Sequence, residues 1–225
     1  MPATTVETVE TVAGGGGGSG RHGGDLPGGG GGGGGRDDGR DDFEQRRQQA
    51  ARTGIWVALA PILMLFTAFA SAYIVRRGLG GGWEPLALPP VLWLNSAVLL
   101  LSSWTLEQAR GALSRGQPAR FSRWWSITMA LGTLFLAGQL LAWLQLAGQG
   151  VYLASNPSGS FFYLLTATHA VHLMGGIAGL VYVSWQAVRA GGAPVRRTPV
   201  DVAAVYWHFL GILWVLLFVM LLLWR

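Results

Sequence analysis

The chain contains no cysteine and no lysine, and it has few charged residues of either sign. Without cysteine it has no disulfides, no thiolate metal sites and no cysteine nucleophile. Charged residues make up 12% of the 225 and hydrophobic residues 51%, whereas soluble domains average roughly 25% charged. This composition excludes an ordinary soluble domain and indicates a membrane protein. Because the arginines fall largely in short segments between apolar runs, the net charge of +5 indicates membrane orientation and no nucleic-acid partner.

The N-terminal segment, residues 1–50, has almost nothing to bury. It contains polyglycine runs at 14–18 and 28–35, followed by a mixed-charge stretch at 36–47. Glycine at this density loses too much backbone entropy on ordering, and no apolar surface offsets the loss. We therefore expect a disordered Gly-rich tail over 1–50, which lacks the apolar core of a secretory signal peptide, and a membrane domain over 51–225.

Five apolar runs follow the tail, each close to the ~20 residues that cross a ~30 Å hydrocarbon core. They cover about 55–75, 89–106, 124–146, 161–188 and 202–224. The segments between them are short and rich in Gly, Pro and Arg, so they leave little room for an extramembrane domain. The sequence predicts an all-α, polytopic membrane protein, a bundle of five transmembrane helices.

The placement of arginine predicts the orientation of this bundle. With the N-terminus inside, ten arginines flank the inner ends of the spans and three flank the outer ends. The positive-inside rule then favours an N-in, C-out topology. The Gly- and Arg-rich composition suggests a bacterial source, so the expected location is the bacterial cytoplasmic (inner) membrane. Tryptophans near span ends, Trp125 among them, are interpreted as interfacial anchors.

A polar stripe runs along the fourth span. Tyr163, Thr166, His169 and His172 follow one another at steps of three, which keeps them on neighbouring positions of a helix surface. In hydrocarbon such groups need partners within the protein. The sequence therefore predicts an interhelical polar cluster that holds the register of the bundle, formed by His169, His172, Tyr206, His208, Gln139 and Thr166. Close helix packing is predicted at Gly175, Gly176 and Gly179.

The same residues also allow a metal, haem or transport site as an alternative. The one pair that could hold a haem iron from two helices is His172 with His208. His169 and His172 are spaced i, i+3 on one helix, which leaves too little room for two haems and provides one ligand too few for a metal cluster. No acidic residue lies clearly at mid-membrane. We expect no catalytic, cofactor-binding or metal-binding residue in this chain. An independent membrane cytochrome and a small transporter remain alternatives, although a transporter would need a lined polar path or an inverted repeat.

Several motifs together resemble subunit III of the haem-copper oxidases (cytochrome c oxidase subunit 3). The sequence THAVHLMGG stands at 168–176, and Tyr206-Trp207-His208-Phe209 opens the final span. Residues 64–78, residues 92–103 and the pair Gln139 with Trp143 also resemble family positions. The resemblance covers about 54–224, which is nearly everything outside the tail.

This resemblance implies an accessory subunit without redox cofactors, bound beside catalytic subunit I and subunit II of a respiratory oxidase. The haems and copper are expected in the catalytic partner, and the accessory subunit is expected to support assembly, stability and proton uptake. The five spans resemble the last five of the seven-helix form, in which the first two helices frame a cleft for phospholipid, so membrane lipid is a further implied ligand. A subunit III-like component of a quinol oxidase or of a nitric oxide reductase is the alternative.

The chain departs from the family pattern at two places. Pro61-Ile62 stands where many members have Ser-Glu, and Gly211 stands where the last helix often has Asp. A role of that glutamate in proton buffering or lipid binding therefore does not carry over to this chain. The partner of the histidine cluster is also expected to differ.

Overall fold

The computed structural model describes residues 38–80, 88–152, 157–189 and 196–223. The chain divides into two units, Met1–Arg40 and Asp41–Arg225. Of the first unit only residues 38–40 are described, as the start of a helix. The predicted disorder of the tail therefore falls, for residues 1–37, outside the described residues.

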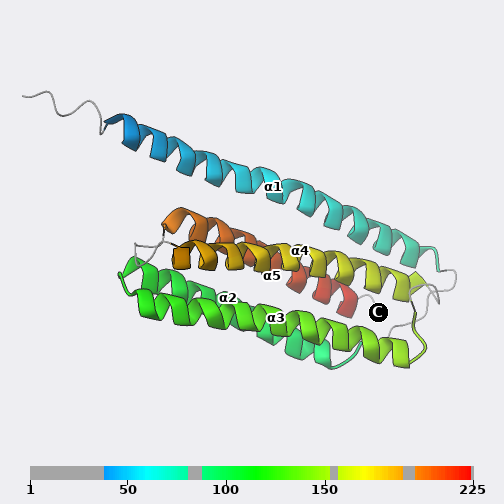
Figure 1. The fold of residues 1–225 in the computed structure, drawn as a ribbon. Helices are drawn as coiled ribbons and strands as arrows, with labels where there is room; N and C mark the ends of the chain where they lie inside the picture. The colour runs from blue at the N-terminus through cyan, green and yellow to red at the C-terminus, as the bar shows by residue number, and fades with distance from the viewer. Residues whose placement is uncertain (1–37, 81–87, 153–156, 190–195, 224–225) are drawn as a thin grey trace, which may run out of the picture. The chain divides into compact units, whose positions relative to one another are not determined.

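The described residues form five helices (Figure 1): α1 (Asp38–Gly78), α2 (Val91–Ser114), α3 (Pro118–Gly148), α4 (Pro157–Arg189) and α5 (Arg197–Leu223). The predicted all-α class is confirmed. Four helices are long and apolar enough to cross a membrane, namely Gln49–Gly78 within α1, α3, α4 and α5. The helix α2, which covers residues 91–106 of the expected span 89–106, does not meet that measure. Its buried face carries Asn95, Ser102 and Thr105, which lower its apolarity while facing protein.

The helices are longer than the apolar runs that predict them. α1 begins at Asp38, so it includes residues 38–50 that the sequence assigned to the tail. Residues 43–52 contain neither glycine nor proline, and extending an existing helix needs no new nucleus. Glycines with positive φ end the three turns after α1, α2 and α3, at Gly80, Gly116 and Gly150, where a side chain would be strained.

α2 and α3 form an antiparallel hairpin joined by residues 115–117. α5 packs against α2 and α4, and α3 also packs against α4. α1 reaches α4 through aromatic rings: the Tyr73 and Phe161 centroids lie 5.8 Å apart. Only 11% of the most apolar stretch of α1 is buried, compared with 33–44% in α3, α4 and α5. α1 is therefore the most exposed of these helices, and its exposed apolar side chains suit contact with lipid.

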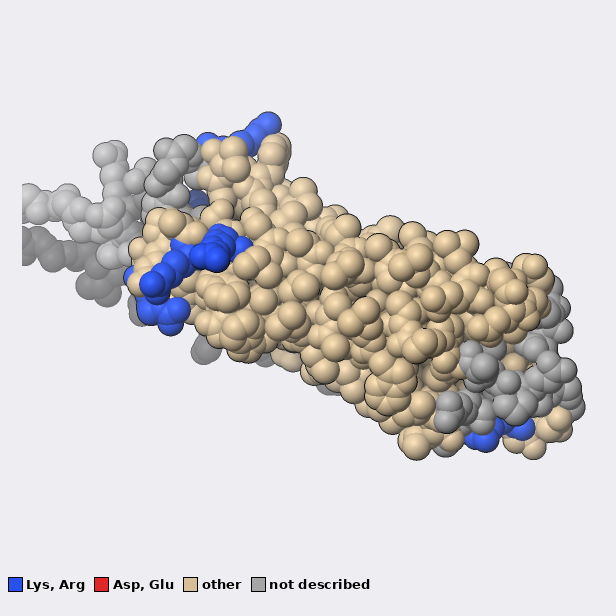
Figure 2. All heavy atoms as spheres, turned by 90° about the horizontal axis from the view of Figure 1, so that it is seen from below, with Lys and Arg blue, Asp and Glu red and all other residues tan. Residues whose placement is uncertain are grey.

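The alternating direction of α2 to α5 brings the end of α2, the start of α3, the end of α4 and the start of α5 to the same end of the bundle. Figure 2 shows arginine side chains at both ends of the face it draws, with none along its middle. The arginines on these four helix ends are Arg110, Arg115, Arg120, Arg123, Arg189 and Arg197. Arg76 and Arg77 lie in the last turn of α1. This distribution is the one that the positive-inside argument used, and the N-in, C-out topology stays a prediction.

Candidate functional site

Four tryptophans connect neighbouring helices through their indole N–H groups. Each donates to a serine or threonine hydroxyl on another helix at 3.0 Å: Trp207 to Ser102, Trp214 to Ser96, Trp143 to Thr166, and Trp125 to Ser184. Each of these hydroxyls in turn donates to a main-chain carbonyl of its own helix, at distances between 2.7 and 3.1 Å. We call these four contacts the indole–hydroxyl links.

The indole–hydroxyl links satisfy both partners without water. An indole N–H is a donor only, whereas a hydroxyl donates once and accepts from a second group. A hydroxyl that bonds its own helix therefore still has a lone pair for a tryptophan on the next helix. Such interhelical bonds contribute about 0.6 to 2 kcal/mol each inside a membrane. The main effect of the links is to fix the register of α5 on α2 and of α3 on α4.

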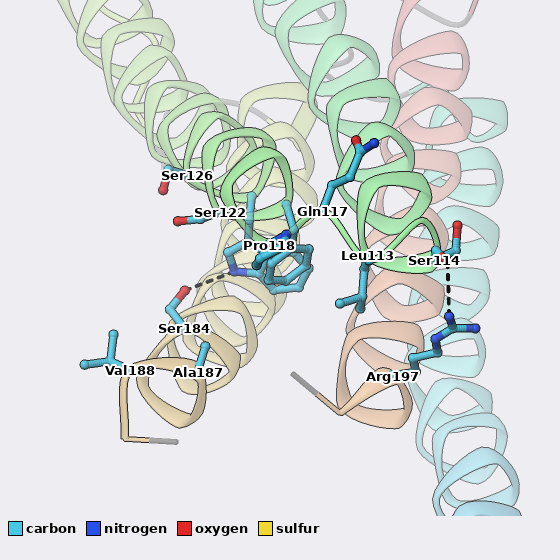
Figure 3. A pocket seen from close by; sticks show the side chains of 13 residues that line it. Leu113, Ser114, Gln117, Pro118, Ser122, Ser126, Ser184, Ala187, Val188 and Arg197 are labelled. Atoms are coloured by element: carbon cyan, nitrogen blue, oxygen red, sulfur yellow. Dashed lines mark hydrogen bonds between the residues drawn. The ribbon is translucent and has the colours of Figure 1, made fainter. Parts of the chain in front are cut away.

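Trp125 shows how this pattern departs from the sequence interpretation. The sequence placed it at the interface as an anchor, but its side chain is buried, and its Nε1 also donates to the carbonyl of Leu180 at 3.2 Å. Figure 3 shows the bond to Ser184 across the α3–α4 boundary. In the sequence, a tryptophan near a span end looks the same whether its ring faces lipid or a neighbouring helix. The helix packing decides between the two.

Of the predicted polar cluster, Thr166 takes part in one of these links, and Tyr206 joins α5 to α4. The Tyr206 hydroxyl donates to the main-chain carbonyl of His172 at 3.1 Å. The His172 ring nitrogen Nδ1 lies 2.7 Å from the carbonyl oxygen of Thr168, on its own helix. The imidazole of His172 therefore does not bridge two helices by hydrogen bonds, although its backbone does.

His169 and Gln139 are fully buried in the bundle. Among the described residues, their side-chain nitrogen and oxygen atoms are the buried ones that have no hydrogen-bond partner. The His169 ring is surrounded by aromatic rings, with centroid distances of 5.9 Å to Phe135, 6.4 Å to Phe66 and 5.1 Å to Trp214. This surrounding is apolar, so a charged imidazole there would be strongly disfavoured. His169 acts in packing α1, α3 and α5 onto α4.

His208 lies in a different environment, at the arginine-rich end. Its Nε2 is 2.7 Å from Glu107 Oε1, Arg110 lies 2.8 Å from the same oxygen, and Arg110 also pairs with Asp201 at 2.9 Å. Partial burial by itself would raise the pKa of Glu107, but the hydrogen bonds and charges of Arg110 and His208 outweigh it and hold that pKa below its ordinary value. His208 therefore bonds to α2, and among the described residues no hydrogen bond joins it to His169 or His172.

The predicted packing glycines differ in their contacts. A Cβ added at Gly176 would lie 3.3 Å from Trp207 and from Tyr206, and one at Gly175 would lie 3.6 Å from the Tyr206 hydroxyl. A Cβ at Gly179 would meet nothing within 4 Å. Of the three predicted glycines, Gly176 is therefore the one that α5 approaches most closely, and the GxxxG spacing does not identify it.

Two glycines on α3 that sequence reasoning missed make closer approaches. A Cβ at Gly132 would lie 2.5 Å from the Trp207 ring, and one at Gly138 would overlap the side chain of Asn95. Asn95 uses this space to donate to the Phe135 carbonyl at 3.4 Å. No signal in the sequence identifies these two positions, because the residue opposite a glycine is set by the packing of whole helices.

Within the described part of the chain, no group of three or more His, Asp or Glu residues is arranged to hold a metal ion. The two histidines considered for haem contact different helices: the His172 ring lies 5.6 Å from that of Phe66 on α1, and His208 bonds Glu107 on α2. Most of the polar side chains of the described spans instead bond to neighbouring helices or to their own helix. These contacts describe a scaffold whose polar residues fix helix positions.

The fold and these contacts define an all-helical, multi-pass membrane protein whose polar residues join its helices. The family model for cytochrome c oxidase subunit III matches residues 48–225, and the chain belongs to this family. It is accordingly an accessory subunit III of a haem-copper oxidase.

Curated relatives agree with the family match. The chain is 33% identical over 175 residues to the probable cytochrome c oxidase subunit 3 of Nocardia farcinica, covering 74% of this chain and 83% of the relative. It is 30% identical to the subunit of Thermostichus vulcanus, covering 75% and 84%. It is 34% identical to the probable subunit of Mycobacterium bovis, covering 73% and 83%.

Proposed function

We propose that the chain binds beside catalytic subunit I and subunit II of an oxidase in the bacterial cytoplasmic membrane, with its N-terminus inside and its C-terminus outside. It carries no redox cofactor, and the haems and copper reside in the catalytic partner. Its role is to support the assembly, stability and proton uptake of the complex, which transfers electrons to dioxygen.

The match of the family model over residues 48–225 carries this proposal, because it covers four of the five helices completely and most of α1. The contacts within the bundle support it. The histidines that could ligate haem are either packed among aromatic rings or bonded to Thr168 and Glu107. The indole–hydroxyl links then give the bundle a fixed shape on which a larger partner can pack.

The test is a pull-down of the full chain from its native membranes in a mild detergent, using a tag on its C-terminus. Optical spectroscopy and mass spectrometry identify what accompanies it, and untagged membranes provide the control. The expected result is that subunits I and II co-purify with a haem spectrum, while the chain separated from them is colourless. A separated chain that absorbs in the Soret region would overturn the proposal in favour of an independent cytochrome.

The same preparation separates the related enzymes by their electron donor and acceptor. Dioxygen consumption with reduced cytochrome c supports a cytochrome c oxidase. Consumption with quinol alone would assign the chain to a quinol oxidase, and reduction of nitric oxide in the absence of dioxygen would assign it to a nitric oxide reductase. Protease accessibility of an N-terminal tag in right-side-out vesicles tests the topology, since protection of that tag is expected.

A further inference from the structure

Three arginines come together in one pocket at the arginine-rich end of the bundle. A cavity of about 310 Å³ is lined by Arg115 at the end of α2 and by Arg120 and Arg123 in the first turns of α3, together with Gln108, Ala112 and Trp124. We call it the arginine pocket. The hairpin turn between α2 and α3 folds the two helix ends back on each other and so brings these residues together.

Within α2 to α5, no acidic residue is left to balance the positive charge of the arginine pocket. The acidic residues of α2 and α5, Glu107 and Asp201, are both paired with Arg110, and α3 and α4 contain no acidic residue. Among the arginines of the pocket, Arg120 donates to Gln117 at 3.2 Å. Figure 2 shows no acidic side chain among the described residues on the face that it draws. Each guanidinium offers five donors, so most donors of this pocket are free to bind an external acceptor.

The chemistry that fits such a pocket is a phosphate group. Planar guanidinium groups match the oxygens of phosphate in bidentate geometry and bind it more strongly than single ammonium groups do. An isolated cluster of like charges is unfavourable without a counter-ion, so an anion bound there would also stabilise the α2–α3 turn.

The surface next to the arginine pocket is apolar and leads along α2 toward the middle of the membrane. Trp124 lines the pocket, and its ring contacts that of Trp104 edge-on, with centroids 5.5 Å apart. Gln108, Trp104 and Leu101 follow at helical steps of four and three, so they lie along one face of α2. Trp104 is 52% exposed and Leu101 is 48% exposed.

This line of residues leads from the pocket into the membrane. Trp104 and Leu101 fall inside the expected span 89–106, so an acyl chain below a headgroup in the pocket would enter the hydrocarbon core along these two exposed side chains. We propose that the arginine pocket binds one acidic phospholipid, with its phosphate among Arg115, Arg120 and Arg123 and one acyl chain along Trp104 and Leu101. The site lies on α2 and α3 alone, and it does not depend on which oxidase the chain serves.

The test measures lipid binding to the delipidated full chain in detergent by native mass spectrometry, at constant ionic strength. Phosphatidylglycerol is the acidic probe and phosphatidylcholine the zwitterionic one. Glycerophosphoglycerol, the same acidic headgroup without chains, and inorganic phosphate test for a soluble source. The variant Arg115→Gln/Arg123→Gln is compared with Arg76→Gln/Arg77→Gln, which also removes two charges but in the last turn of α1. Circular dichroism verifies that both variants are folded.

The expected result is saturable binding of one phosphatidylglycerol, roughly 30-fold weaker in Arg115→Gln/Arg123→Gln and within about twofold of wild type in the control. Replacing Trp104 with alanine is expected to weaken phosphatidylglycerol binding without changing the weak binding of glycerophosphoglycerol. Equal affinity for phosphatidylcholine, or equal loss in both double variants, would overturn the proposal. Displacement of the lipid by glycerophosphoglycerol or phosphate at matching concentration would assign the pocket to a soluble anion and overturn the lipid assignment.

Discussion

Trp207 occupies the centre of the bundle, and replacing the glycine above its ring should show how tightly α2, α3, α4 and α5 are packed. A Cβ at Gly132 would lie 2.5 Å from one atom of the buried indole and 2.9 Å from another. The ring cannot easily move away, because its N–H is bonded to Ser102 and its other side lies close to Gly176. We therefore expect Gly132→Ala to force the helices apart.

The magnitude follows from a matched comparison with Gly179→Ala. Both substitutions replace a helical glycine and gain about 1 kcal/mol of helix propensity, but a Cβ at Gly179 meets nothing within 4 Å. The propensity gain cancels, so the difference between the two variants is the overpacking penalty of about 1–3 kcal/mol. Unfolding of the full chain by SDS in mixed micelles, followed by circular dichroism, measures both free energies.

A double-mutant cycle identifies the cause of the penalty. Trp207→Phe removes the part of the indole that the new methyl group would meet, so Gly132→Ala should lose most of its penalty in that background. The coupling energy is expected to be about 1 kcal/mol or more, in the favourable direction. Equal stability of Gly132→Ala and Gly179→Ala would refute the reasoning, and so would a penalty that is unchanged when Trp207 is replaced.

Three further variants test other contacts. Ser102→Ala leaves the buried N–H of Trp207 without an acceptor and should lower the free energy of unfolding by about 1–2 kcal/mol, while Ser103→Ala on the next position serves as its control. His172→Leu should change that free energy by less than about 0.5 kcal/mol, since Tyr206 bonds the His172 main chain; a larger loss would show that the imidazole itself holds two helices. The depressed pKa of Glu107 contributes stability that is present above its ordinary value of 4.5 and is lost as the pH falls through the lower folded value. Unfolding midpoints of Glu107→Gln should therefore vary less than wild type below about pH 5, and parallel pH profiles would contradict this.

The class of this protein and its family followed from the sequence alone. Low charge and long apolar runs are properties of single segments, and they indicate a helical membrane protein without reference to any contact. The motif at 168–176 with Tyr206-Trp207-His208-Phe209 likewise indicated the family that the comparisons confirmed. The helix bounds were less exact, because a helix continues past its apolar run until a glycine or proline ends it.

The partner of each polar side chain was decided only by the tertiary structure. A three-residue step shows that His169 and His172 lie on similar sides of α4, but it does not show which helix lies opposite. Packing places His169 among aromatic rings and joins His208 to Glu107, 101 positions away. The arginine pocket and the indole–hydroxyl links arise in the same way, because they depend on the rotation and register of whole helices. These are fixed by the summed packing of buried residues on several helices, which no single stretch of sequence contains.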